Sequence, residues 1–163
     1  NSYGGEGFGL NRSVDRIKSL SSDQLFIHEK NINQPPWVLI NISNLYYAIG
    51  EIENAKLKLE DMDVFEIHEA FAGQVLANIK CLNDEQFCKD RLNKDQTVGK
   101  IDMTKVNQWG GSLSIGHPFG ATGARLLNTA ANRLHNEGGK YAILSACAAG
   151  AHGHAMIIKK YEE

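Results

Sequence analysis

The stretch GGSLSIGHPFGATGAR, residues 110–125, constrains the fold of this chain more than any other segment. It places a histidine directly before a proline, between two short glycine-rich runs. Glycine permits tight backbone turns and proline fixes the backbone beside it, so this segment is predicted to be a stiff loop. Loops of this kind bring backbone close to a ligand, and they also serve as plain turns. The rest of the sequence has to decide between these two interpretations.

Segments with regular periodicity flank this loop on both sides and predict an α/β fold. Before the loop they are a strand at 37–42, a helix at 45–58, a strand at 63–68 and a helix at 69–82. After the loop they are a helix at 122–137, a buried strand at 141–147 and a final strand at 154–161. This alternation is typical of a layered α/β fold.

Apolar stripes predict which face of each helix is buried. In the helix at 69–82 the stripe consists of Phe71, Val75 and Ile79, with Ala72 and Leu76 beside it. In the helix at 122–137 it consists of Leu126, Leu127, Ala130, Ala131 and Leu134. Gly138 is predicted to end that second helix in a left-handed conformation. Residues 83–106 are charged and weakly patterned, which indicates a surface excursion.

Composition excludes several classes of function. The chain has 163 residues, 42% of them hydrophobic, which suits one domain or one half of a larger protein. Its net charge is −2 and no basic stripe appears, so nucleic acid is not a predicted partner. No apolar run approaches the roughly 20 residues of a membrane-spanning helix.

Cysteine and histidine spacing predicts neither disulfides nor a metal site. The three cysteines, Cys81, Cys88 and Cys147, fit neither a disulfide framework nor a zinc site, and indicate reduced thiols in an intracellular compartment. His152 and His154 could ligate a metal, but no third ligand lies at a useful spacing.

His117 lies at the tip of the glycine-rich loop and is the first candidate functional residue. Pro118 fixes the backbone after it, and Gly116 and Gly120 allow the loop to pass close to a ligand. An imidazole held in this way can act as a base or a hydrogen-bond donor. The alternative is a surface histidine in a turn.

Cys147 and His68 are the other two candidates, each at the end of a predicted strand. Small residues follow Cys147, so its thiol could act as a nucleophile or an acid/base group, or it could be a buried structural thiol. His68 stands where α/β proteins place their sites, and the helix start beside it favours a neutral imidazole. The alternative for His68 is that it caps that helix.

Three motifs in this order resemble the C-terminal half of the thiolases. They are HEAFAGQ at 68–74, NQWGGSLSIGHPFGATGAR at 107–125 and YAILSACAAGAHGHA at 141–155. The resemblance covers about residues 44–161. His68, the wording NQWGGSLS and the polar insertion near 83–104 resemble the branch of 3-ketoacyl-CoA thiolases that forms the β subunit of the mitochondrial trifunctional fatty-acid oxidation complex.

The resemblance implies both a division of the chain and a fold. Residues 1–43 match the thiolases poorly and are expected to be a docking or linker segment. Residues 44–163 are expected to form the thiolase C-terminal domain, with the polar insertion near 83–104. The implied fold is the thiolase-like layered α/β fold, in which a mixed sheet is packed by helices.

The resemblance also implies an activity. A 3-ketoacyl-CoA thiolase is an acetyl-CoA C-acyltransferase that cleaves 3-ketoacyl-CoA with CoA, giving acetyl-CoA and a shortened acyl-CoA in fatty-acid β-oxidation. Coenzyme A is then a substrate, no cofactor is expected, and the implied location is mitochondrial.

By position, the resemblance implies a role for each candidate. His117 corresponds to the base that activates an acylated cysteine and donates to the thioester oxygen. His68 corresponds to the position that holds a water for the same oxyanion hole. Cys147 corresponds to the acid/base that exchanges a proton with the acetyl-CoA carbanion. The remaining implied contacts are the backbone N–H of Ala149 in a second oxyanion hole and the substrate-binding residues Phe71, Gly116 and Pro118.

Nothing in residues 1–43 resembles the motif of the acylated cysteine. We therefore expect that nucleophile in an N-terminal thiolase half, in the same or a partner chain, and we expect the 163-residue polypeptide alone to be inactive. The other implied partners are a second copy in a homodimer or tetramer and the hydratase/dehydrogenase α subunit of a trifunctional complex.

Two alternatives stay open at this point. The chain could be a catalytically inactive, thiolase-derived subunit with a structural or assembly role, or a Cys–His hydrolase in which Cys147 itself is acylated. The catalytic interpretation depends on one geometric expectation: His117 and Cys147 converge on a shared cavity that His68 lines.

Overall fold

The computed structural model describes residues 49–50, 52–148 and 152–161. Its elements in chain order are η1 (Leu59–Asp61), β1 (Val64–Ile67), α4 (Ala72–Leu82), α5 (Glu85–Leu92), η2 (Met103–Lys105), α6 (Ser112–Ile115), α7 (Thr122–Glu137), β2 (Tyr141–Ala148) and β3 (His152–Lys159). The strand predicted at 37–42 lies outside the described residues. Within the described part of the chain, no helix has the length and apolar character needed to cross a bilayer.

The three strands form one mixed sheet in the order β1-β2-β3. β2 lies in the middle, parallel to β1 with Ala142 opposite Val64, and antiparallel to β3 with Ala142 opposite Ile158. A parallel pair needs a long crossover connection, and residues 68–140 supply it, carrying α4 to α7. The predicted mixed sheet packed by helices is therefore confirmed.

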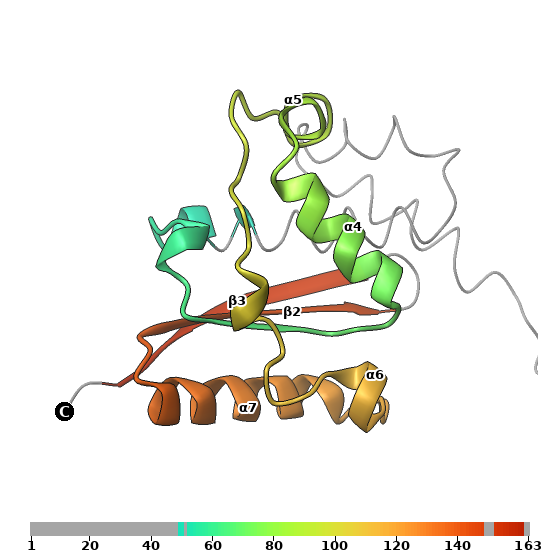
Figure 1. Cartoon of the computed structure of the whole chain (residues 1–163), viewed down its shortest axis with the longest axis vertical. Coiled ribbons are helices and arrows are strands. Elements are labelled where there is room, and N and C mark those ends of the chain that lie inside the picture. The colour runs from blue at the N-terminus through green and yellow to red at the C-terminus, as the bar shows by residue number, and fades with distance from the viewer. Residues whose placement is uncertain (1–48, 51, 149–151, 162–163) are drawn as a thin grey trace, which may run out of the picture.

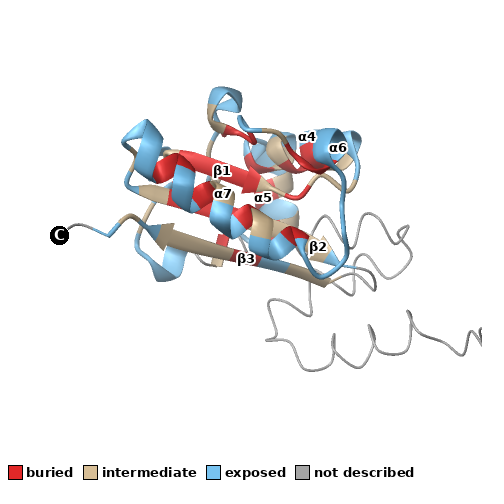
Figure 2. Cartoon of the chain, turned by 90° about the horizontal axis from the view of Figure 1, so that it is seen from below, coloured by how far each residue is buried: buried red, intermediate tan, exposed pale blue. Residues whose placement is uncertain are grey.

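Helices cover both faces of this sheet. Figure 1 shows α7 along one face and α4 on the opposite side. Ala142 and Leu144 of β2 pack on the α7 side with Leu126, whereas Ile143 packs with Phe65 in the cluster on the α4 side. The continuous apolar run of β2 is explained by this double cover. Figure 2 shows that β1 is largely buried while β3 is mostly of intermediate exposure.

α7 has the bounds predicted from the sequence, but its buried stripe differs from the prediction. Leu126, Ala130 and Leu134 are buried as expected, whereas Leu127 and Ala131 are exposed. Arg133 takes part in the buried face instead, because an acidic partner on β1 lies beneath it. The helix ends at Gly138, whose φ of 80° is the predicted left-handed conformation.

α4 starts at Ala72, later than the predicted position 69, and buries a different face. Val75 is buried as predicted, together with Asn78 and Leu82, while Phe71 is 72% exposed. Phe71 keeps an extended backbone (φ −147°, ψ 139°). Just before it, the Glu69 carboxylate accepts hydrogen bonds from the Asn107 side chain and the Leu113 N–H.

The helix predicted at 45–58 also ends early. Residues 49–50 and 52–54 are helical and the chain turns at 55–56. Lys56 has a φ of 55°, and the Leu57 N–H donates to the Ile52 carbonyl, which closes the helix end.

The segment 83–106 is more regular than the predicted surface excursion. It contains α5, which begins where the Asp84 carboxylate accepts a hydrogen bond from the Phe87 N–H (2.7 Å) and ends at Asn93 (φ 53°). Cys88 and Leu92 of α5 are buried in the core cluster on the α4 side of the sheet. The glycine-rich loop likewise contains one helical turn, α6, that was not predicted.

Candidate active site

His68 directly follows β1 and is held at the carboxyl edge of the sheet. Its backbone N–H donates to the Ser145 carbonyl of β2 (2.8 Å), which continues the strand pairing by one residue. Its ring Nδ1 lies 2.8 Å from the Ser112 hydroxyl of α6. The side chain is 4% exposed. The imidazole is therefore fixed between the sheet edge and the glycine-rich segment.

His117 lies against His68 although they are 49 positions apart in the sequence. The two ring centroids are 4.1 Å apart and the ring planes are inclined by 38°. His117 follows Gly116, which ends α6 with a φ of 92° that favours glycine. The structure thus brings together two of the three side chains predicted from the sequence.

The first residue of α7 orients the exposed ring of His117. Nδ1 of His117 lies 2.6 Å from the Thr122 hydroxyl. That hydroxyl donates to the Pro118 carbonyl (3.4 Å), so its oxygen accepts the hydrogen bond from His117. In a neutral His117 the proton then lies on Nδ1, and Nε2 keeps a free lone pair.

Asn107 and Glu69 join the two motifs around this histidine pair. The Asn107 side chain exchanges two hydrogen bonds with the backbone of Ile67, both 2.8 Å long. The same amide donates to Glu69 Oε1 (2.7 Å), and Glu69 Oε2 accepts from the Leu113 N–H (3.1 Å). The segment that carries His68 is in this way tied to the start of α6.

Gly111 makes this connection possible. A Cβ built at this position would overlap the Glu69 carboxylate group. The backbone there has a φ of −102°, which any residue adopts, so the requirement for glycine is one of space. The close approach of backbone that the glycine-rich sequence predicts is thus realised here against a carboxylate of the chain itself.

Arg125 places a positive charge beneath His68. Its Nη2 donates to the Ser112 hydroxyl (3.0 Å), the same oxygen that meets His68. Burial lowers the pKa of His68 from its usual 6.5, and the neighbouring His117 and Arg125 lower it further, against the opposite effect of Glu69.

The neutral form of His68 was expected, but its cause differs from the expectation. The helix start was expected to favour it, whereas burial is the main reason. The alternative that His68 caps the helix is wrong, because Phe71 is the N-cap of α4 and no side chain caps it.

A buried ion pair lies deeper below the site. Arg133 of α7 donates to Glu66 of β1 (2.9 Å), and their side chains are 1% and 0% exposed. Arg133 also bonds Glu137 and the Lys105 carbonyl. Burial raises the pKa of Glu66, even though Arg133 acts in the other direction. This pair fixes β1, and with it the strand end that carries His68, onto α7.

Cys147 lies at the same edge of the sheet, near the end of β2. It is opposite Gly153, partly buried, and its thiol is free. Alternation along β2 puts it on the same face as Ile143, the α4 side, whereas His68 bonds to α6. Within the described residues, no hydrogen bond or ring contact joins Cys147 to either histidine. Convergence of the thiol and the imidazoles over the sheet edge stays a prediction.

The remaining predicted contacts differ in their placement. Phe71, Gly116 and Pro118 are exposed on the loops next to the histidine pair. The Pro118 carbonyl accepts from the Ala121 and Thr122 N–H groups, which turns the chain into α7. Ala149 lies outside the described residues.

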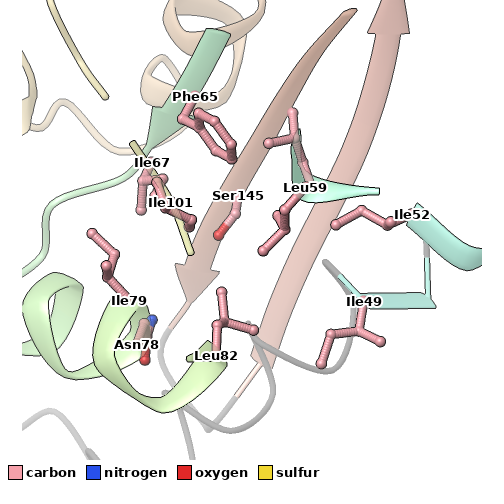
Figure 3. A pocket seen from close by; sticks show the side chains of 11 residues that line it. Ile49, Ile52, Leu59, Phe65, Ile67, Asn78, Ile79, Leu82, Ile101 and Ser145 are labelled. Atoms are coloured by element: carbon pink, nitrogen blue, oxygen red, sulfur yellow. The ribbon is translucent and has the colours of Figure 1, made fainter. Parts of the chain in front are cut away.

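An apolar cavity between α4 and the sheet is separate from these groups. Figure 3 shows its lining side chains, among them Ile79, Leu82, Phe65 and Ile101. Its volume is about 30 Å³, comparable to one water molecule. It is too small for a substrate arm and is a packing gap.

Sequence reasoning missed the polar side chains that support the two histidines. Ser112, Arg125, Asn107 and Glu69 all lie inside the motifs, but Ser112, Asn107 and Glu69 carried no local signal of their roles. The one usable signal is Arg125: a long charged side chain in the first turn of a helix that packs on the sheet needs a polar partner there.

Comparison with known proteins identifies the family of this chain. Residues 27–160 match the model of "Thiolase, C-terminal domain". The "Probable 3-ketoacyl-CoA thiolase" of Caenorhabditis elegans is 50% identical over 130 residues, which cover 80% of this chain and 29% of that protein. The mitochondrial "Trifunctional enzyme subunit beta" of Bos taurus is 48% identical over 130 residues, which cover 80% of this chain and 27% of that protein.

A solved structure agrees with these relatives. Human mitochondrial 3-ketoacyl-CoA thiolase superposes with a TM-score of 0.59 and 34% sequence identity, over 75% of this chain and 27% of that one. A second structure of that enzyme, in complex with CoA, also has a TM-score of 0.59, with 33% identity over 76% of this chain and 27% of that one. The chain thus spans less than a third of the length of these relatives.

The family match begins at residue 27, inside the segment 1–43 that the motifs leave unmatched, and the division at residues 43/44 stays a prediction. The expected layered thiolase-like fold is confirmed by these matches together with the mixed sheet. This chain belongs to the thiolase family, and residues 27–160 carry the family's C-terminal domain.

Proposed function

We propose that this chain is the C-terminal half of a 3-ketoacyl-CoA thiolase of fatty-acid β-oxidation. The reaction is cleavage of 3-ketoacyl-CoA by CoA into acetyl-CoA and a shortened acyl-CoA. The nucleophilic cysteine belongs to an N-terminal half, and coenzyme A is a substrate, with no further cofactor. One relative was solved in complex with CoA.

The ring contact between His68 and His117 carries this proposal. Activation of a thiol needs an imidazole nitrogen with a free lone pair, and Nε2 of His117 has one when Nδ1 bonds Thr122. The ring is exposed, so a thiol from another domain has access to it. His68 supplies a second, buried imidazole within ring contact for the developing negative charge on a thioester oxygen.

Cys147 is proposed as the acid/base that exchanges a proton with the α-carbon of acetyl-CoA. Its free, partly exposed thiol at the carboxyl edge of β2 is compatible with that role. The backbone N–H of Ala149 is proposed for a second oxyanion hole. Phe71, Gly116 and Pro118 are proposed to contact the thioester and its pantetheine arm, since all three are exposed beside the histidine pair.

A relative named as the β subunit of a trifunctional enzyme supports assembly into a complex. The proposed partners themselves are those that the thiolase resemblance implies. They are the N-terminal thiolase half, a second copy in a dimer or tetramer, and the α subunit of a trifunctional complex. The proposed location is the mitochondrion, after the relatives named mitochondrial. The exposed apolar side chains near the histidines support a covering domain; they are Phe71, Leu113, Ile115 and Phe119.

A chimera tests the proposal directly. Residues 27–160 replace the matching region of the Caenorhabditis elegans relative, and thiolysis of acetoacetyl-CoA and of a longer 3-ketoacyl-CoA is followed by loss of the substrate's absorbance. We expect turnover in the chimera and a loss of at least about 100-fold in kcat/KM for its His117→Ala variant, since a general base contributes 10²–10⁴-fold.

His135→Ala is the matched control, because His135 is an exposed histidine of α7 at the end remote from Thr122. It should keep the activity of the chimera. A folded chimera without activity would instead favour the structural or assembly subunit, and activity that survives His117→Ala would overturn the assigned base.

A further inference from the structure

The Ser112 hydroxyl lies between a permanent cation and the buried histidine. Its oxygen is 3.0 Å from Arg125 Nη2 and 2.8 Å from His68 Nδ1, and Ser112 is 7% exposed. These two groups are its hydrogen-bond partners among the described residues. A serine hydroxyl has one proton to donate and two lone pairs to accept.

The guanidinium of Arg125 decides which groups donate and which accept in this network. Arg125 can only donate, so the Ser112 oxygen accepts from it. If His68 also donated from Nδ1, the serine proton would be left buried without an acceptor, which costs about 1–3 kcal/mol. If Ser112 donates to an unprotonated Nδ1, every group in the chain of bonds is satisfied. The second arrangement is therefore the more stable one.

We propose that Ser112, oriented by Arg125, is a positioning residue that fixes neutral His68 in the tautomer with its proton on Nε2. The tautomer itself does not depend on the proposed function; its use in the reaction does. Burial and the charges of Arg125 and His117 favour the neutral ring that this arrangement requires, while Glu69 is the acidic group that acts against them.

The two neighbouring rings then differ in the hydrogen-bonding group that each presents. Thr122 leaves His117 with a free lone pair on Nε2, and Ser112 leaves His68 with an N–H at Nε2. Nε2 of His68 has no hydrogen-bond partner among the described residues. It is also not among the buried polar atoms that lack a partner, so it is accessible to a ligand. The pair thus presents one acceptor and one donor side by side, which suits a step that removes a proton and stabilises an oxyanion.

Arg125 itself is held under the site by burial. Its Nε and Nη1 are sealed from solvent without partners among the described residues, so the guanidinium reaches a hydrogen-bond partner there only through Nη2, at Ser112. Its charge acts on both Glu66 and His68. A lysine at this position would keep the charge but lose the planar group that reaches the hydroxyl.

Histidine ¹⁵N NMR of the 18.0 kDa chain tests the tautomer. Long-range proton–nitrogen spectra at neutral pH distinguish protonated from unprotonated ring nitrogens, and the His68 signals are assigned by their loss in His68→Gln. We expect Nε2 protonated and Nδ1 unprotonated in the unmodified chain. In Ser112→Ala, the Nδ1–H form should rise to a comparable population, and Ser112→Thr, which keeps the hydroxyl, should restore the original pattern.

Ser114→Ala is the matched control in the same helical turn. The Ser114 hydroxyl donates to the Gly111 carbonyl and does not reach His68, so the tautomer should not change. Arg125→Gln provides a second variant, for which mixed tautomers are expected even if Ser112→Ala does not fold. A His68 protonated on Nδ1 in the unmodified chain, or an unchanged pattern in both Ser112→Ala and Arg125→Gln, overturns the proposal. An inactive chimera with the expected tautomer would overturn the proposed function alone.

Discussion

The side-chain amide of Asn107 pairs with both backbone groups of Ile67, as a neighbouring strand would. Its Oδ1 accepts from the Ile67 N–H and its Nδ2 donates to the Ile67 carbonyl, each at 2.8 Å. Its own N–H donates to the Phe65 carbonyl (2.9 Å), and Val106 forms a parallel bridge to Phe65. A φ of 47° at Asn107 turns the chain so that the amide can make this contact. The outer edge of β1 is thereby paired up to the residue before His68.

Replacement of Asn107 by alanine is expected to destabilise the chain by about 2–3 kcal/mol. Two backbone groups of Ile67 and one carboxylate oxygen of Glu69 lose their partner at a position that is 9% exposed. The free energy of unfolding in urea measures the loss. Asn136→Ala is the control, because its exposed amide bonds the Asn132 carbonyl of its own helix, and a loss of similar size there would contradict the explanation.

Gly111→Ala should cost about 1–3 kcal/mol, because the new methyl group displaces the Glu69 carboxylate from its two hydrogen bonds. In a Glu69→Ala background the same substitution should cost less, which a double-mutant cycle measures. Gly123→Ala is the matched control: nothing lies within 4 Å of its added Cβ, so stability should stay the same or rise by up to about 1 kcal/mol. Equal costs for Gly111→Ala in both backgrounds would refute the proposed overlap.

His68 should make the folded state sensitive to acid. Its pKa is lowered in the folded chain from 6.5, so the unfolded chain binds the proton more readily. The contribution of His68 is therefore complete above pH 6.5 and is lost as the pH falls from 6.5 through the lower, folded-state pKa. Urea unfolding at a series of pH values should show a smaller acid loss for His68→Asn than for the unmodified chain. Loss of another imidazole, in His135→Asn, serves as the control, and an acid loss equal in the unmodified chain and His68→Asn would rule the effect out.

Breaking the buried pair of Glu66 and Arg133 on one side should be costly. Glu66→Leu leaves the Arg133 charge buried with Glu137 as its remaining acidic partner, and about 3 kcal/mol of stability should be lost. The double variant Glu66→Leu with Arg133→Met should recover most of that loss, since two apolar side chains then meet across the same contact. Thermal unfolding of the three variants decides this, and additive losses in the double variant would contradict it.

Elements with a strong local signal could be predicted from the sequence. α7 is an example, because its apolar spacing and the glycine after it gave its bounds and three residues of its buried face, although Leu127 and Ala131 are exposed. β2 is another, since four apolar residues in a row, Tyr141 to Leu144, suit a strand covered on both faces. α5 was missed because only Phe87, Cys88 and Leu92 are apolar among eight residues, and their burial depends on packing against α4 and the sheet.

The residues of the candidate site also differ in whether the local sequence indicates them. His68 and His117 stood out because each follows a strand or lies in a glycine-rich loop. Ser112 and Asn107 could not be found in this way, because their partners lie about 40 positions away and only the crossover between β1 and β2 brings them together. Arg133 shows a further limit of prediction from sequence. A charged residue on an apolar helix face can be recognised in the sequence, but its partner Glu66 cannot.

The position of β2 after the crossover also affects how the chain folds during synthesis. Val64 of β1 meets its partner Ala142 of β2 only after the whole crossover has been translated. Until then the backbone of His68 has no Ser145 carbonyl to bond. A nascent chain that stalls between residues 125 and 141 would carry both imidazoles and their polar supports before β2 is available to pair with β1. It would expose the apolar faces of β1 and α7, and it would be a natural target for chaperones.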